Sequence, residues 1–169
     1  GLSFMEVVLP AAIFVQLFSA SKLTTILADN GAHWLEKMNL GGIPLPLMFI
    51  LLCTFINLFI TSGSAKWLIL APIFVPMFSI VGFPPALTQV AYRIGDSSSN
   101  IISPLSYYVP VIIGLLEQYR SDPDTKIGIG TVISLEMPYT IAYLIFFSAL
   151  LIVWYTLGIP LGPGAPVTM

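Results

Sequence analysis

Long stretches without a charged residue follow one another along this chain, separated by short polar breaks. No Asp, Glu, Lys or Arg occurs within residues 38–65, 67–92, 97–116 or 137–169. About 18 consecutive apolar residues are enough to cross a bilayer as one helix. The pattern therefore predicts an all-α integral membrane protein.

The breaks divide the chain into four apolar units, which are residues 2–28, 45–81, 86–118 and 127–157. We expect the first unit to be a transmembrane helix, because its length suffices at a rise of about 1.5 Å per residue. We expect the last unit to be the final transmembrane helix, kinked at Pro138. The glycine-rich residues 29–44 predict a loop, with a short amphipathic turn near residues 33–38.

The unit at residues 45–81 is interrupted by the polar sequence "TSGSAK" at residues 61–66. Neither apolar piece comfortably crosses a hydrocarbon core of roughly 30 Å by itself. The pair therefore predicts a helical re-entrant hairpin, which enters the membrane and returns with its polar tip inside.

The unit at residues 86–118 is interrupted by "RIGDSSSNIISP" at residues 93–104. Helices are expected at residues 86–95 and 104–118, so the unit predicts a transmembrane helix broken in its middle. Unwound backbone inside a membrane leaves polar groups unpaired unless it is buried in protein or lines a polar cavity. Paired discontinuous helices of this kind are typical of secondary transporters, where they hold substrate and coupling ion.

The composition agrees with a membrane protein and excludes several function classes. Hydrophobic residues make up 57% of the chain and charged residues only 8%, against roughly 25% charged in soluble domains. A net charge of −2 without a basic patch argues against a nucleic-acid partner. The sequence has a single histidine, His33, and no P-loop, so neither a hydrolase nor direct ATP coupling is indicated, and no cofactor is expected. The single cysteine, Cys53, predicts a small packing residue.

Asp96 and Arg93 are the charged residues of the predicted break. A carboxylate at this position would coordinate Na⁺ or carry a proton, or it would form a salt bridge with Arg93 three residues earlier. Arg93 would hold a substrate carboxylate through two hydrogen bonds, or it would balance the charge of Asp96. Ser98 and Asn100, with the neighbouring serines, offer cation or substrate ligands, and the alternative is capping of a helix beginning near residue 103.

Polar residues of the hairpin form the other half of the predicted site. Ser64 at the tip has the same two interpretations as the serines of the break. Asn57 lies in an apolar helix, where it would bind an ion or satisfy neighbouring backbone. Trp67 could stack on an aromatic ligand, and Lys66 would snorkel or balance charge. Glu136, in the last helix, could pair with a neighbouring helix.

Three long motifs, "FINLFITSGSAKWLILAPIFVPMF", "YRIGDSSSNIISPL" and "LGIPLGPGAP", resemble the C-terminal third of the AbgT family, over residues 3–166. These proteins are p-aminobenzoyl-glutamate transporters, also described as antimetabolite exporters. The resemblance implies a homodimer whose subunits have nine spanning helices and two re-entrant hairpins in inverted repeats. It implies coupling to Na⁺ or protons, and sulfonamide efflux in some members.

The resemblance also implies site residues by position. The Na⁺ site would use Asn57 and Asp96. The substrate cavity would include Ser64, Trp67, Pro85, Arg93, Asp96 and Pro104. The family pattern places a further aspartate in an N-terminal half that this chain lacks, so we expect the chain to be the C-terminal part of a longer protein and to require that half.

The sequence thus predicts an ion-coupled secondary transporter of p-aminobenzoyl-glutamate or related aromatic acids, multi-pass in the cell inner membrane, with the lipid bilayer and a second subunit as partners. One alternative is a transporter of other organic anions, such as dicarboxylates. Another is a truncated membrane fragment that does not transport and whose polar residues are structural.

Overall fold

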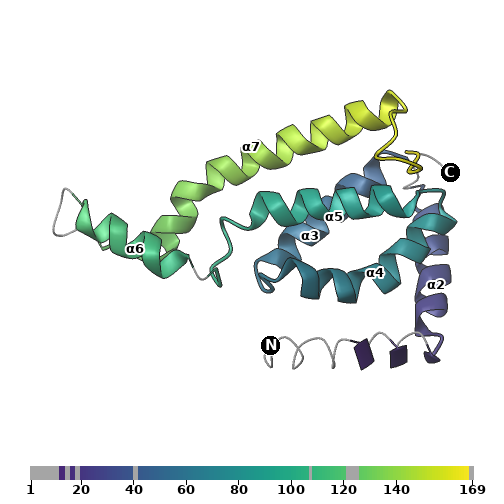
Figure 1. Cartoon of the computed structure of the whole chain (residues 1–169), viewed down its shortest axis with the longest axis horizontal. Helices are drawn as coiled ribbons and strands as arrows, with labels where there is room; N and C mark the ends of the chain where they lie inside the picture. The colour runs from purple at the N-terminus through teal and green to yellow at the C-terminus, as the bar shows by residue number, and fades with distance from the viewer. Residues whose placement is uncertain are drawn as a thin grey trace.

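The computed structural model describes residues 12–13, 16–17, 20–39, 42–106, 108–120 and 126–167 (Figure 1). Within these ranges the regular secondary structure is helical, apart from an isolated bridge between Gly162 and Ala165. The main helices are α2 (Leu23–Lys37), α3 (Pro44–Asn57), α4 (Gly63–Ile80), α5 (Pro85–Ser99), α6 (Val109–Gln118) and α7 (Ile129–Thr156). The all-α prediction is confirmed for the part of the chain that the structure describes.

Helices α3 and α4 form a helix pair whose turn, residues 58–62, lies at the polar sequence between the two apolar pieces. Pro44 begins α3, where its missing N–H costs nothing. Ser62 caps α4, because its hydroxyl accepts a hydrogen bond from the Ala65 N–H at 3.3 Å. The two helices are joined away from the turn by Phe49, whose ring centroid lies 4.8 Å from that of Phe74 and 5.0 Å from that of Phe78.

Helix α5 packs along α3 and also contacts α4, as Figure 1 shows. Gly95 allows the close approach to α3, because a Cβ at this position would lie 2.6 Å from the Ile50 carbonyl oxygen and 2.8 Å from the Cys53 Cβ. Helix α7 covers another part of α5. Helix α5 is therefore held between the helix pair and the last long helix.

The helix break lies farther along the chain than the sequence predicted. Helix α5 continues through Ser99, and α6 begins at Val109, so the serines at 97–99 are helical and do not cap the second piece. The Ser99 hydroxyl donates to the Gly95 carbonyl oxygen at 2.6 Å. A serine hydroxyl can be satisfied in this way within a helix, so the polar sequence is compatible with the helical path observed.

Residues 29–37 were predicted as a loop, and this is wrong, because they are part of α2. Ala28, Ala32 and Leu35 are buried on one face of that helix, which packs on α4. Gly31 lies directly against the Met77 side chain, so the glycine serves close helix packing. Burial of this face stabilises a helix that the local composition does not favour.

The first predicted helix, residues 2–28, is interrupted in the structure. Residues 21 and 22 form a turn in which Lys22 has a left-handed backbone with φ of 56°, and α2 starts afresh at Leu23. A left-handed residue ends a helix because it cannot continue the right-handed path. Residues 2–11, 14–15 and 18–19 of the predicted span lie outside the described residues.

Two helices, α4 and α7, are long and apolar enough to cross a membrane, while α3 and α6 are shorter apolar helices. Helix α7 is continuous over 28 residues with Pro138 inside it, and Figure 1 shows it bending in its N-terminal part. Most of its apolar side chains are exposed, among them Ile141, Ile145 and Phe146. Such a surface is suited to lipid or to further protein helices.

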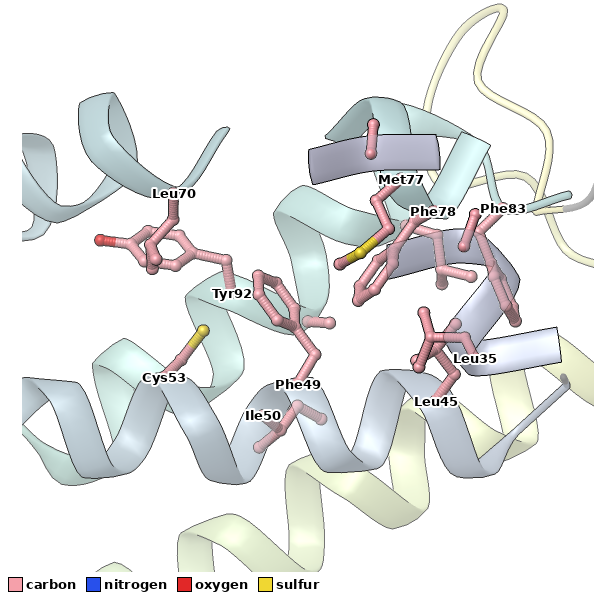
Figure 2. Packing of buried hydrophobic residues seen from close by; sticks show 14 of the residues in the cluster. Leu35, Leu45, Phe49, Ile50, Cys53, Leu70, Met77, Phe78, Phe83 and Tyr92 are labelled. Atoms are coloured by element: carbon pink, nitrogen blue, oxygen red, sulfur yellow. The ribbon is translucent and has the colours of Figure 1, made fainter. Parts of the chain in front are cut away.

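The buried core joins α2, the α3–α4 pair and α5. Figure 2 shows the rings of Phe49, Phe78 and Phe83 packed with Leu35 and Leu45. Ile50, Cys53 and Tyr92 continue this cluster toward the turn between α3 and α4. The core therefore holds the turn and the end of α5 in a fixed relation, and the polar site lies there.

Candidate functional site

Three polar residues from three helices meet beneath the turn of the α3–α4 pair. Asn57 is the last residue of α3, Lys66 lies in the first turn of α4, and Asp96 lies in the last turn of α5. Their exposed fractions are 0%, 1% and 4%. The Lys66 ammonium forms an ion pair with Asp96 Oδ1 and donates a hydrogen bond to Asn57 Oδ1. We call these residues the Asn57–Lys66–Asp96 cluster.

The amide nitrogen of Asn57 extends this cluster to the end of α5. It donates to the Asp96 carbonyl oxygen at 3.1 Å, to Ser99 Oγ at 2.9 Å and to Asn100 Oδ1 at 2.9 Å. The amide group thus satisfies backbone and side-chain acceptors of α5 while its own oxygen faces Lys66. Two roles were predicted for Asn57. Its amide nitrogen satisfies a neighbouring backbone carbonyl group directly, and its amide oxygen is of a chemical type that can also ligate a cation.

The local sequence explains why α5 approaches the turn so closely. A Cβ at Gly63 would lie 2.8 Å from Asp96 Oδ2, so a larger residue would push the carboxylate away. The Tyr92 hydroxyl donates to the Gly63 carbonyl oxygen, one helical turn before Asp96. Gly63 and Tyr92 together allow the first turn of α4 to pack closely on α5.

The burial of this ion pair is energetically demanding. Each charge loses its hydration in the interior, and the pair compensates only when its geometry and remaining hydrogen bonds are good. Removing one partner from such a pair typically costs about 3–5 kcal/mol, because the other charge stays buried alone. The cluster therefore couples the position of the α3–α4 turn to that of α5.

The alternative that Asp96 forms an ion pair with Arg93 is wrong: among the described residues, the carboxylate pairs with Lys66 instead. Arg93 is exposed and lines a cavity of about 310 Å³ between α5 and α7, together with Ser97 and Phe147. Asp96 is buried against the turn of the α3–α4 pair, whereas Arg93 is exposed on the side of α5 that faces α7. Arg93 is therefore not needed to neutralise the charge of Asp96.

The other predicted substrate residues are placed unevenly around this site. Ser64 is exposed on the first turn of α4, and Trp67 is half-buried with its ring centroid 4.9 Å from that of Tyr92. Pro104 is half-buried in the non-helical segment after α5. Pro85 is exposed at the opposite end of α5, roughly 16 Å along the helix from Asp96 at 1.5 Å per residue. The structure brings Ser64, Trp67 and Asp96 into one region and leaves Pro85 outside it.

The remaining polar residues of the break differ in their surroundings. Ser98 is buried, and its hydroxyl has no hydrogen-bond partner among the described residues. Asn100 is exposed and lines a cavity of about 590 Å³, together with Ser62 of the turn and Glu136 of α7. One carboxylate oxygen of Glu136 is buried without a partner in the part of the chain described. The sequence marked Glu136 as unusual but did not indicate this cavity.

The sequence placed a Na⁺ site at Asn57 and Asp96, and carboxylate and amide oxygens are ligands that hard cations accept. Both oxygens, however, are engaged by the Lys66 ammonium. Among the described residues there is no group of three or more His, Cys, Asp and Glu side chains that could hold a metal ion. Sequence reasoning considered Lys66 for charge balance without assigning its partner, because residues 57, 66 and 96 converge only in the fold.

Comparison with known proteins places these features among membrane transporters. The model of the AbgT putative transporter family matches residues 2–169. Over 161 residues the chain is 44% identical to the p-aminobenzoyl-glutamate transport protein of Escherichia coli (strain K12), which covers 95% of this chain and 31% of that protein.

Two solved transporter structures resemble the fold. The YdaH transporter of Alcanivorax borkumensis matches with a TM-score of 0.82 and 47% identity, over 90% of this chain and 31% of that one. MtrF of Neisseria gonorrhoeae, from a class of antimetabolite efflux pumps, matches with a TM-score of 0.81 and 42% identity, over 96% of this chain and 32% of that one. The chain therefore spans about a third of the length of each of these relatives.

Proposed function

The chain belongs to the AbgT family of transporters, and from this premise we propose that it forms the C-terminal part of an ion-coupled secondary transporter. Its substrates would be p-aminobenzoyl-glutamate or related aromatic acids, with sulfonamide efflux as a further capacity. The observation that carries the proposal is the buried Asn57–Lys66–Asp96 cluster, which joins the turn of one helix pair to the end of a broken helix. Buried charges in an apolar, membrane-type chain are typical of substrate and ion pathways.

In this proposal, α3 and α4 form the re-entrant hairpin, and α5 and α6 form the two halves of one broken transmembrane helix. The non-helical residues Asn100, Ile101, Ser106 and Tyr108 border the cavity of about 590 Å³, which is where irregular backbone is tolerated at membrane depth. A second, inverted repeat from an N-terminal half would complete the substrate site. The complete transporter would be a multi-pass homodimer of the cell inner membrane.

The substrate would be held by charge and by aromatic stacking. Arg93 is exposed on its cavity and free of Asp96, so its guanidinium can take a substrate carboxylate through two hydrogen bonds. Trp67 would contact the aromatic ring of the substrate from the side of its ring that Tyr92 leaves open. Ser64, Pro85 and Pro104 would contribute to the walls of the completed cavity.

The coupling ion, Na⁺ or a proton, would use Asp96 and Asn57, with Ser98 and Asn100 as further ligands. Asp96 supplies the negative charge, and the buried Ser98 hydroxyl has an unused hydrogen-bonding capacity among the described residues. Because these groups lie on α3 and α5, ion binding would act on the relation between the hairpin and the broken helix.

The test is transport by the complete natural polypeptide that contains this sequence, reconstituted in proteoliposomes. Flux of labelled p-aminobenzoyl-glutamate would be followed with a Na⁺ gradient, a pH gradient or neither. We expect gradient-driven flux that falls at least tenfold in Asp96→Asn. The exposed Asp29→Asn is the matched control and should transport like the unmodified protein. Equal flux in Asp96→Asn would show that this carboxylate is structural only.

A second candidate substrate class is other organic anions, such as dicarboxylates. The observation that favours it is the position of Arg93, which can bind a carboxylate whatever else the substrate carries, while Tyr92 already covers part of the Trp67 ring. Competition of unlabelled dicarboxylates against labelled p-aminobenzoyl-glutamate distinguishes the two classes. Absence of flux for every anion would favour a membrane fragment that does not transport.

A further inference from the structure

We propose that Lys66 is a built-in competitor for the coupling cation, so that its ammonium and a bound Na⁺ occupy the cluster in turn. The inference rests on the proposed function in one respect, which is that a cation binds at Asn57 and Asp96. It adds a role for a residue to which the ion-coupling proposal gives none.

The argument starts from the atoms that Lys66 occupies. Its Nζ contacts Asp96 Oδ1 and Asn57 Oδ1, the negatively charged oxygen and the amide oxygen that would ligate a metal cation. The three residues are almost completely buried, with exposed fractions of 0–4%, so there is little room for a second cation beside the ammonium. A Na⁺ ion that binds these two oxygens must therefore displace Nζ.

The charge of the cluster leads to the same conclusion. One carboxylate, one ammonium and one amide give a neutral group, which is the form that is tolerated away from water. Adding Na⁺ while Lys66 stays in place would leave an excess positive charge in a buried site. Replacement of the ammonium by Na⁺ keeps the site neutral, provided that Lys66 moves its charge to water.

Lys66 has a route for this movement. It lies in the first turn of α4, directly after the exposed residues Thr61, Ser62 and Ser64. The long lysine side chain can keep its stem in the apolar packing while its ammonium reaches a nearby aqueous surface. When it leaves, the hairpin loses its ion pair with α5, while the Tyr92 bond to Gly63 and the Asn57 bonds to the end of α5 remain.

The test measures cation binding by the purified complete polypeptide in detergent, without substrate. Thermal unfolding is followed while NaCl replaces choline chloride at constant ionic strength, because an ion that binds the folded state raises Tm. We expect Lys66→Met to reach its half-maximal rise in Tm at a Na⁺ concentration at least tenfold lower than the unmodified protein. Lys37→Met, which removes an exposed lysine at the end of α2, should respond like the unmodified protein. The double variant Lys66→Met/Asp96→Asn should show no response.

A second measurement needs no variant and decides the matter if Lys66→Met does not fold. An amine-reactive reagent is applied to the unmodified protein in NaCl and in choline chloride, and labelling of Lys66 is compared with that of Lys37 by peptide mass spectrometry. Displacement predicts a several-fold rise in Lys66 labelling in NaCl and none at Lys37. The proposal is overturned if Lys66 labelling is unchanged or lowered at the highest NaCl used. It is equally overturned if a folded Lys66→Met responds to Na⁺ no more strongly than the unmodified protein.

These outcomes are separable from those of the transport experiment. Transport that fails for want of the right substrate leaves the binding and labelling results unaffected. Conversely, Na⁺-driven transport with unchanged Lys66 labelling would retain the proposed function and reject the role of Lys66 as a competitor.

Discussion

Tyr92 joins the apolar core to the polar site within one side chain. Its ring is buried in the core cluster and lies beside Trp67, while its hydroxyl donates to the Gly63 carbonyl oxygen at the start of α4. The hydroxyl therefore holds the first turn of α4 against α5 at the position where Gly63 passes close to Asp96. The hydroxyl oxygen therefore adds a hydrogen bond to the packing that the ring alone would provide.

Tyr92→Phe removes the hydroxyl and keeps the ring. We expect a loss of about 0.5–1.5 kcal/mol in the free energy of unfolding, the usual net worth of one hydrogen bond, with a lower Tm in detergent. The matched control is Tyr139→Phe on the exposed surface of α7, which should leave Tm unchanged. A Tm for Tyr92→Phe equal to that of the unmodified protein would show that the hydroxyl bond to Gly63 contributes nothing to stability.

At the residue scale, the sequence predicted the chemistry of the site better than its contacts. Asp96 and Asn57 were each singled out as polar residues in apolar segments and were paired only through the family resemblance, and the structure places them together around Lys66. The partner of Asp96 was misjudged, because spacing along one helix favours Arg93 and says nothing of a lysine thirty positions away in another helix. Lysines in membrane chains usually reach outward, so burial of Lys66 had no local signal.

At the element scale, close packing of α3 on α5 depends on Gly95. A methyl group there would meet the Ile50 carbonyl oxygen and the Cys53 side chain, and neither backbone nor Cβ can turn aside as a long side chain can. The two helices would have to move apart, which would also pull Asp96 away from the turn of the α3–α4 pair.

Gly95→Ala is therefore expected to destabilise the protein by about 1–3 kcal/mol, the common range for overpacking. Gly114→Ala in α6 is the control, because a methyl group there would meet no packing neighbour within 4 Å and alanine favours the helix. Thermal unfolding of both variants in detergent measures the difference. If Gly95→Ala is as stable as Gly114→Ala, α3 and α5 are not held at the distance described.

Two helical segments show where local sequence signals are insufficient to predict an element. Residues 29–37 carry Asp29, Asn30 and Gly31, which favour a loop, yet burial of Ala28 and Ala32 against α4 makes them helical. The serines at 97–99 suggested an unwound segment, yet they are part of α5, where Ser99 donates to the Gly95 carbonyl oxygen and Asn57 to the Asp96 carbonyl oxygen. In both places the deciding contacts come from the fold, which single-segment reasoning does not contain.

At the scale of the whole molecule, α7 is the helix whose length and surface are best suited to a membrane. It is the longest apolar helix described, and its middle exposes Ile141, Ile145 and Phe146. In water this surface would be costly, while in a bilayer it meets lipid or the apolar faces of other helices.

Ile145→Lys tests that role by placing a charge near the centre of α7. A lysine at the centre of a spanning helix costs about 2.5–3.5 kcal/mol for insertion, so we expect a clear fall in the fraction of protein that resists alkaline carbonate extraction from membranes. Leu157→Lys is the matched control: this residue is equally exposed, at 65% against 66%, but it lies just beyond the end of the helix. There the ammonium can reach the interface, and extraction should not change. Equal resistance of both variants would mean that Ile145 does not lie at membrane depth, and α7 would then have to cross the bilayer in another register.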